Sequence, residues 1–270
     1  MSLASVYLRL SNEQPEAAAV SDRRGGGLTY RALWERSEAL YRSGLVNRGE
    51  VVAVHLDRTC EWMVTYVALL RCGAVVLPLD SDNEKREFRE SRNTKAISNV
   101  PVYYEPRARV KLAVVLDKAS AEEFKKIYEP DFDVVSLDSL PPAGAVHTSP
   151  DYCTDPAPVF CLMQTGGSTT GQPKLVPILH AMATSEVDNY AHVVPSLSDA
   201  SGHVVMSHSP MVWTASAVGQ VNIALALGGC VAFKESGADL QTSLNDIRPT
   251  VIGGVPSQFL QVQKIPESVR

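Results

Sequence analysis

Short apolar runs rich in β-branched residues, alternating with longer helical patterns, place the strongest constraint on how this chain can fold. Residues 51–56 (VVAVHL) predict a buried strand, residues 59–72 predict a mostly apolar helix that stops before Gly73, and residues 74–79 (AVVLPL) predict a second buried strand. Strands that are apolar throughout are buried on both faces. The pattern therefore predicts an α/β fold with parallel-rich sheets covered by helices.

The same alternation continues along the chain in two groups. Residues 138–158 carry five prolines and little periodicity, so we expect a loop that separates one α/β subdomain, residues 1–150, from a second, residues 151–270. Thr29 is the expected N-cap of an early helix, and Ser120 opens a stretch with the spacing of a capping box. Further strands are predicted at 112–116, 133–137, 159–165, 203–207, 230–233 and 249–257, and further helices at 181–194 and 214–227.

Charge and cysteine content exclude several classes of function. A net charge of -5 and a pI near 5.7 provide no general field for polyanions, so nucleic acid is not an expected partner and any anion site has to be local. The start of the chain lacks the apolar core of a signal peptide, and no run approaches the ~18 apolar residues of a membrane span. The cysteines form no CxxC pair, which is typical of reduced thiols in a cytoplasmic protein; they are Cys60, Cys72, Cys153, Cys161 and Cys230.

One stretch, residues 163–180 (MQTGGSTTGQPKLVPILH), is typical of an anion-binding loop. It follows a predicted strand, at the edge where open α/β sheets bind ligands. Its glycines let backbone amides approach a ligand, its hydroxyls donate hydrogen bonds and its lysine adds a positive charge, a combination suited to phosphates. The alternative is a flexible linker with a surface lysine, which the flanking apolar runs disfavour. The candidate phosphate-binding residues are Thr165, Gly166, Gly167, Ser168, Thr169, Thr170, Gly171 and Lys174.

The loop does not fit the Walker A pattern GxxxxGK[ST]. Gly166 and Gly171 have the required spacing, but two residues separate Gly171 from Lys174, and Leu175 follows the lysine in place of a hydroxyl. The segment KLVPIL, residues 174–179, has strand character with an internal proline. We therefore expect an edge strand after the loop rather than a phosphate-capping helix.

The loop and three further segments resemble the adenylate-forming superfamily of acyl-CoA synthetases, luciferases and nonribosomal peptide adenylation domains. TGGSTTGQPK (165–174) is similar to that family's Thr/Ser/Gly-rich loop ending in Pro-Lys, and the interval from this lysine to the next histidine also matches. LTYRALWERSEAL (28–40) resembles its N-terminal helix motif. LLRCGAVVLPLD (69–80) and RPTVIGGVPS (248–257) resemble later strand elements, and all four segments stand in the family's order.

The resemblance implies an enzyme that uses ATP and Mg²⁺ to activate a carboxylic acid as an acyl-adenylate, which then passes to the thiol of CoA or of a carrier protein. It implies that the loop and Lys174 hold the β- and γ-phosphates, and that His180, Trp213 and Thr214 line the acid pocket. The alternative for His180 and Trp213 is a place in the core. Amino-acid-activating members carry an aspartate near the position of Thr214, so the threonine favours an acid without an α-ammonium group. No catalytic residue is assigned.

The sequence also departs from the family. The segment GGSTTG is one residue longer than the usual form, and Leu175 stands where glycine is commonest. The family continues with turns for adenine, magnesium and ribose and with a mobile C-terminal domain that bears a catalytic lysine. We therefore expect an N-terminal half that needs a C-terminal half to form acyl-adenylate. The alternatives are another nucleotide-binding enzyme and a truncated, noncatalytic nucleotide- or partner-binding protein.

Overall fold

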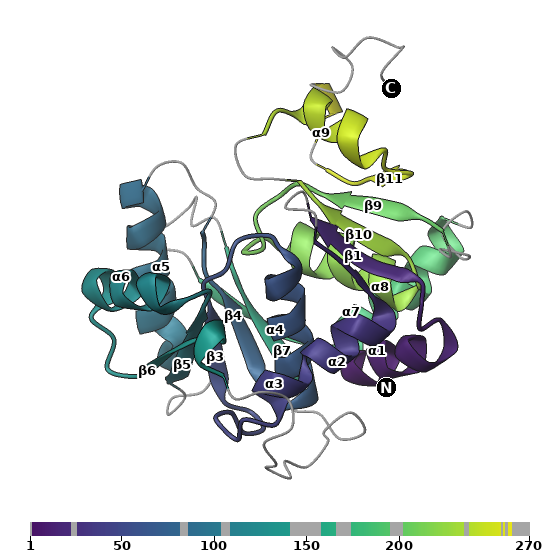
Figure 1. Ribbon diagram of the computed structural model, residues 1–270. Helices are drawn as coiled ribbons and strands as arrows, with labels where there is room; N and C mark the ends of the chain where they lie inside the picture. The colour runs from purple at the N-terminus through teal and green to yellow at the C-terminus, as the bar shows by residue number, and fades with distance from the viewer. Residues whose placement is uncertain are drawn as a thin grey trace.

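The computed structural model describes residues 2–22, 26–81, 86–103, 109–140, 158–165, 174–194, 202–234, 238–254, 256, 259 and 260, without the side chains of residues 101–103 and 191. Within these ranges two sheets enclose a layer of helices and carry further helices on their outer faces (Figure 1). The outer helices are α5 (Arg86–Tyr103) and α6 (Lys118–Tyr128) on one sheet and α9 (Leu240–Ile247) on the other. The central layer holds α1 (Leu3–Glu13), α2 (Tyr30–Arg36), α3 (Glu38–Tyr41), α4 (Cys60–Arg71), α7 (His180–Val193) and α8 (Ile223–Ala226).

The larger sheet has six strands in the order β6-β5-β3-β4-β7-β8. All its neighbouring strands are parallel except β7 and β8. β3, β4 and β7 are buried along their whole length, which confirms the buried strands predicted from their apolar runs. The strands are β3 (Val51–Val54), β4 (Val75–Pro78), β5 (Val110–Val115), β6 (Asp133–Ser136), β7 (Val159–Gln164) and β8 (Leu175–Leu179). A short 3₁₀ helix, η1 (Leu137–Ser139), follows β6.

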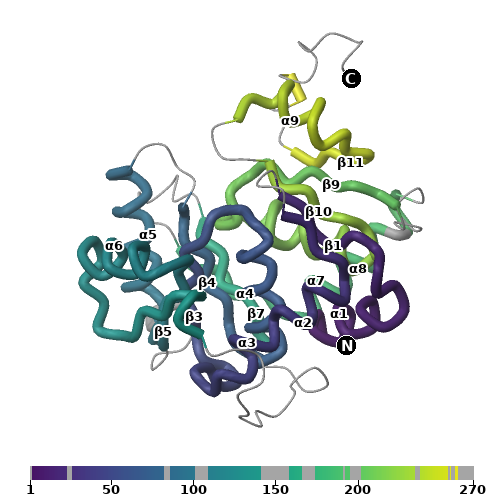
Figure 2. Tube along the Cα trace, viewed as in Figure 1, coloured from purple at the N-terminus to yellow at the C-terminus, as the bar shows by residue number. Residues whose placement is uncertain are grey.

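The smaller sheet has five strands in the order β11-β9-β10-β1-β2. Its strands are parallel except for β2, which runs antiparallel to β1. Val20 on β1 pairs with Val231 on β10, so the first strand of the chain lies beside one of the last, as Figure 2 shows. The strands are β1 (Ala18–Asp22), β2 (Gly27–Thr29), β9 (Val204–Ser207), β10 (Cys230–Phe233) and β11 (Val251–Ile252).

Each sheet takes strands from both halves of the chain. β1 and β2 leave the first half to join β9, β10 and β11, whereas β7 and β8 come from the second half and extend the sheet of β3 to β6. The expected division near residue 150 therefore does not coincide with the boundary between the two sheets. The fold class itself, parallel-rich sheets covered by helices, is confirmed.

The first residues of α2 and α6 can be compared with the N-caps expected from the sequence. Thr29 caps α2 as expected, because its Oγ1 accepts a hydrogen bond from the Ala32 amide (3.2 Å). The capping box expected at Ser120 is wrong: α6 begins at Lys118 and its N-cap is Asp117. The Asp117 carboxylate accepts from both the amide and the hydroxyl of Ser120 (2.8 Å each), and a charged acceptor makes the stronger cap.

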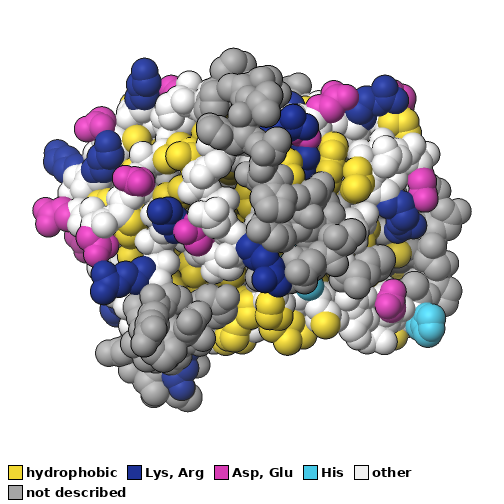
Figure 3. Space-filling view, turned by 90° about the horizontal axis from the view of Figure 1, so that it is seen from below, with side chains coloured by type: hydrophobic (Ala, Val, Ile, Leu, Met, Phe, Trp, Pro, Cys, Tyr) yellow, Lys and Arg dark blue, Asp and Glu magenta, His cyan; other side chains and the backbone are white. Residues whose placement is uncertain are grey.

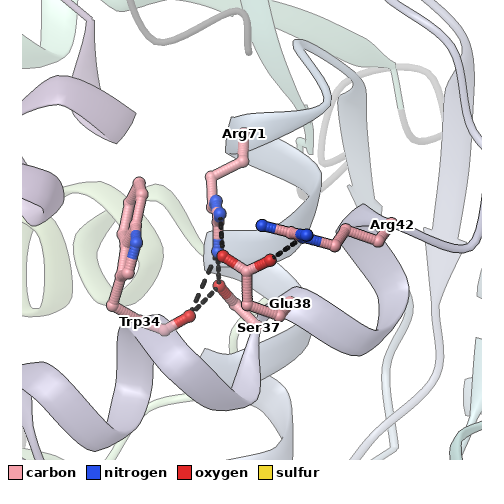
Figure 4. A network of polar contacts seen from close by, with 5 residues as sticks. All are labelled: Trp34, Ser37, Glu38, Arg42 and Arg71. Carbon is pink, nitrogen blue, oxygen red and sulfur yellow. Dashed lines mark hydrogen bonds and ion pairs between the residues drawn. The ribbon is translucent and has the colours of Figure 1, made fainter. Parts of the chain in front are cut away.

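One buried cation joins three helices of the central layer. Arg71 on α4 is only 3% exposed, and its guanidinium lies 3.9 Å and 4.2 Å from the ring centres of Trp34 and Tyr41. It donates hydrogen bonds to Ser37 Oγ (2.7 Å) and to the Trp34 carbonyl (3.1 Å), and it forms an ion pair with Glu38 (Figure 4). Because the charge is stacked, paired and hydrogen-bonded, it can be buried between α2, α3 and α4 without a large penalty.

Charged side chains are distributed over the described residues without a marked concentration of either sign on the face shown in Figure 3, and the described thiols are buried. In the part of the chain that the structure describes, no helix could cross a membrane, and no cluster of three or more His, Cys, Asp or Glu side chains could hold a metal ion. Lys and Arg side chains lie among Asp and Glu on the face drawn in Figure 3. Cys60, Cys72, Cys161 and Cys230 are buried thiols that form no disulfide with one another, and Cys153 lies outside the described residues.

Candidate functional site

The candidate phosphate loop joins β7 and β8 as a hairpin. The hairpin closes at Thr165 and Lys174: the Thr165 amide donates to the Lys174 carbonyl (2.8 Å), and the Lys174 amide donates to Thr165 Oγ1 (2.9 Å). β8, which contains Pro177, forms the edge of the sheet, as the sequence predicted. The Lys174 side chain is exposed. The other predicted phosphate-binding residues, Gly166, Gly167, Ser168, Thr169, Thr170 and Gly171, lie outside the described residues.

Helix α5 supports the strand end from which this loop departs. Arg92 donates from Nε to Gln164 Oε1 (2.9 Å), and Gln164 Nε2 donates to the carbonyl of Pro78 at the end of β4 (3.1 Å). Burial lowers the pKa of Arg92, while the carboxylate of Asp80, 4.0 Å from its Nη1, acts in the opposite direction. These contacts fix the end of β7 and place a positive charge beside Gln164, the residue before Thr165.

A cavity of about 390 Å³, here named the α7–β11 pocket, lies between α7, β9, β11 and the helical segment after β9. That segment is a π-helix, η3 (Ala215–Asn222), which continues into α8. π-Helices are rare and frequently occur at functional sites, where the wider turn redirects side chains. The walls are mainly apolar and include Val205, Ile223, Leu227 and Val251, together with the consecutive glycines 253 and 254.

Few polar side chains line the α7–β11 pocket. Gln220 on η3 donates from Nε2 to the Gly253 carbonyl (2.7 Å), and its Oε1 has no hydrogen-bond donor among the described residues. Glu186 on α7 is half-buried, and burial raises the pKa of its carboxyl. No residue that the structure describes forms a hydrogen bond or ion pair with Glu186. Tyr190 and His203 complete the polar lining with Thr214.

The three residues expected to line an acid pocket occupy different places. Thr214, just before η3, lines the α7–β11 pocket, while Trp213 beside it is 40% exposed and is not among the lining residues. His180, the first residue of α7, is 5% exposed; its Nδ1 accepts from the Leu3 amide (3.3 Å), and its ring lies 5.1 Å from that of Phe160. Burial lowers the pKa of His180 to about 4. Substrate contacts of His180 and Trp213 stay predictions.

Comparison with known proteins identifies the family. The family described as AMP-binding enzyme matches residues 9–268. The chain belongs to the AMP-binding enzyme family. Among curated AMP-binding relatives, the hybrid PKS-NRPS synthetase tasS of Hapsidospora irregularis is 26% identical over 226 residues, 80% of this chain and 5% of that protein. Surfactin synthase subunit 2 of Bacillus subtilis (strain 168) is 27% identical over 188 residues, 68% of this chain and 5% of that protein.

Solved structures of AMP-binding enzymes share the fold. The N-terminal subdomain of Klebsiella oxytoca NpsA in complex with 3-hydroxyanthranilyl-AMSN aligns with a TM-score of 0.77 and 20% identity, over 99% of this chain and 64% of that one. ATP-bound MatB from Rhodopseudomonas palustris aligns with a TM-score of 0.71 and 20% identity, over 98% of this chain and 52% of that one. Both alignments show that this chain shares its fold with these proteins, and in NpsA the match lies in the N-terminal subdomain.

Sequence reasoning missed most of the polar residues in the α7–β11 pocket. Glu186 lies inside a helix that the sequence predicted, but no sequence pattern indicated that it lines a pocket. Gln220 did carry a signal, because it is a polar residue within the mostly apolar segment 214–227. A buried amide in an apolar helix needs hydrogen-bond partners, and here the partner is the backbone of Gly253.

Proposed function

We propose that this chain supplies the phosphate loop and the acid pocket of an enzyme that converts a carboxylic acid to its acyl-adenylate and passes the acyl group to the thiol of CoA or of a carrier protein. The observation that carries the proposal is the hairpin closed by Thr165 and Lys174, in a chain of the AMP-binding family. ATP-bound MatB, with the same fold, supports the use of ATP. Relatives that are nonribosomal peptide synthetases support a carrier-protein thiol as acceptor.

The first step joins the acid to AMP. A carboxylate oxygen attacks the α-phosphorus of ATP, the bond from this phosphorus to the bridging oxygen breaks, and pyrophosphate leaves. Such a reaction depends on positioning and charge neutralisation rather than on a protein nucleophile. The Lys174 ammonium and the loop amides would neutralise the triphosphate, which enters with Mg²⁺. The α7–β11 pocket, with Thr214 in its wall, would hold the acyl group.

The test compares nucleotide binding by the natural protein with that of two lysine variants. Lys174→Ala should weaken ATP binding by on the order of 1.5–3 kcal/mol, the range for a charge-assisted contact. Lys126→Ala removes another exposed lysine, on α6, and should leave ATP binding unchanged. Titration calorimetry measures both affinities, and equal losses, or none, would contradict the phosphate role of Lys174. Acid-dependent exchange of pyrophosphate into ATP tests the adenylation step itself.

A further inference from the structure

We infer that Glu186 selects the substrate of this pocket, and that the acid it accepts carries an amino group that pairs with the Glu186 carboxylate. The inference rests on the proposed function, because only that function makes the bound acid a substrate. Binding of the acid is argued from the α7–β11 pocket itself. It adds a specificity residue on α7 to a pocket that contains one of the three residues predicted for it, Thr214.

The charge of the pocket is the first reason. Among the described lining residues Glu186 is the one carboxylate, and none is Lys or Arg. The walls around it are mainly apolar, and no described residue pairs with it. A partly desolvated carboxylate without a partner is unfavourable, and a cationic or hydrogen-donating group on a ligand would remove that cost.

A second acceptor in the same pocket points to the same ligand. The amide nitrogen of Gln220 is engaged by the Gly253 carbonyl at 2.7 Å, and this contact fixes which end of the amide is the oxygen. Gln220 Oε1 is buried and lacks a donor among the described residues. The pocket therefore offers two acceptors, Glu186 and Gln220, from facing elements α7 and η3. An amine, with several N–H donors, satisfies both kinds of group, whereas a hydrocarbon acid satisfies neither.

The position of Glu186 also bears on the expectation drawn from Thr214. The threonine carries no charge, and an ammonium next to it would lack a counter-ion. Glu186 lies on a different wall, α7, and supplies the charge that Thr214 does not. Recognition of an amino group is thus compatible with the uncharged residue at the start of η3.

The experiment uses a ligand series in which only the amino group changes. 3-Phenylpropanoate and the three amino acids made by placing one amino group on its C2, its C3 or its ring are titrated into the natural protein by calorimetry. We expect at least one amino acid of the series to bind about 10-fold or more tightly than 3-phenylpropanoate, as for a charge-assisted hydrogen bond. Glu186→Gln should remove this preference, because it keeps the side-chain size and deletes the charge.

Asp188→Asn is the matched control, since it makes the same chemical change at an exposed position of α7 outside the pocket lining, and it should leave the preference intact. Equal binding of all four acids, or an unchanged preference in Glu186→Gln, would overturn the inference. Pyrophosphate exchange with the same acids separates the two proposals. Exchange without amino preference refutes the role of Glu186 alone. Amino-selective binding without exchange for any acid refutes the adenylation step and supports recognition by Glu186.

Discussion

Replacing Arg71 with Met should destabilise the fold by about 3 kcal/mol, the lower end of the range for removing one partner of a buried ion pair. The lower end applies because Arg71 is 3% exposed, whereas the Glu38 side chain is 18% exposed and can still meet water. The change also removes the donor to Ser37 Oγ and to the Trp34 carbonyl and the cation stacked between Trp34 and Tyr41. Met fills most of the vacated volume, so a cavity contributes little.

Arg42 provides the control, because it pairs with the same Glu38 carboxylate from the solvent side and its side chain is 45% exposed. Arg42→Met should cost at most about 1 kcal/mol, the value of an exposed ion pair. Arg71→Lys should fall between the two, since it keeps the charge but loses the planar, forked donor. Urea unfolding followed by far-UV circular dichroism gives each free energy of unfolding. If Arg71→Met and Arg42→Met cost the same, the argument from burial is wrong.

Three further predictions follow from single contacts. Burial lowers the pKa of His180 from 6.5 to about 4, so when the pH falls through this window the unfolded chain takes up a proton at this residue before the folded chain does, and the folded state loses stability. His180→Gln should remove roughly 2–3 kcal/mol of that loss, measured as the difference between the free energies of unfolding in urea at pH 7 and pH 4.5. Thr165→Val deletes the acceptor for the Lys174 amide and should weaken ATP binding by about 3–10-fold in titration calorimetry, while Thr165→Ser should restore it. Asn222→Ala removes the acceptor of the buried Tyr66 hydroxyl (2.8 Å) and should lower the thermal-unfolding stability by about 2–3 kcal/mol, and adding Tyr66→Phe should recover part of it.

Local pattern predicted the central elements of the larger sheet well. The apolar runs 51–56 and 74–79 contain β3 and β4, and the pattern over 59–72 contains α4 to within one residue at each end. These elements are buried on every side, so their sequences carry a strong apolar signal. Pairing between distant strands left no such signal. β1, the segment AAVSD, is short and mixed in polarity, and nothing local in it specifies β10 as its neighbour.

The candidate site, like the fold, was predictable from the sequence only where its features are local. The strands that end before Thr165 and begin after Lys174 lie where the sequence predicted them, because apolar runs are local features, and the phosphate role of the two residues stays a prediction. The α7–β11 pocket is formed by α7, η3 and β11, which are brought together only by the tertiary fold. The π-helical register over 215–222 also could not be anticipated, since apolar residues within an apolar helix do not distinguish a π-turn from an α-turn.

The pairing of β1 with β10 has a consequence for how the protein is made on the ribosome. Residues near position 20 emerge about 210 residues before their strand partner near position 230. At synthesis rates of about 5–20 residues per second, this wait lasts on the order of 10–40 s. During that time α1 and β1 expose apolar surface that the finished molecule covers, and such exposed surface is prone to aggregate until β10 arrives.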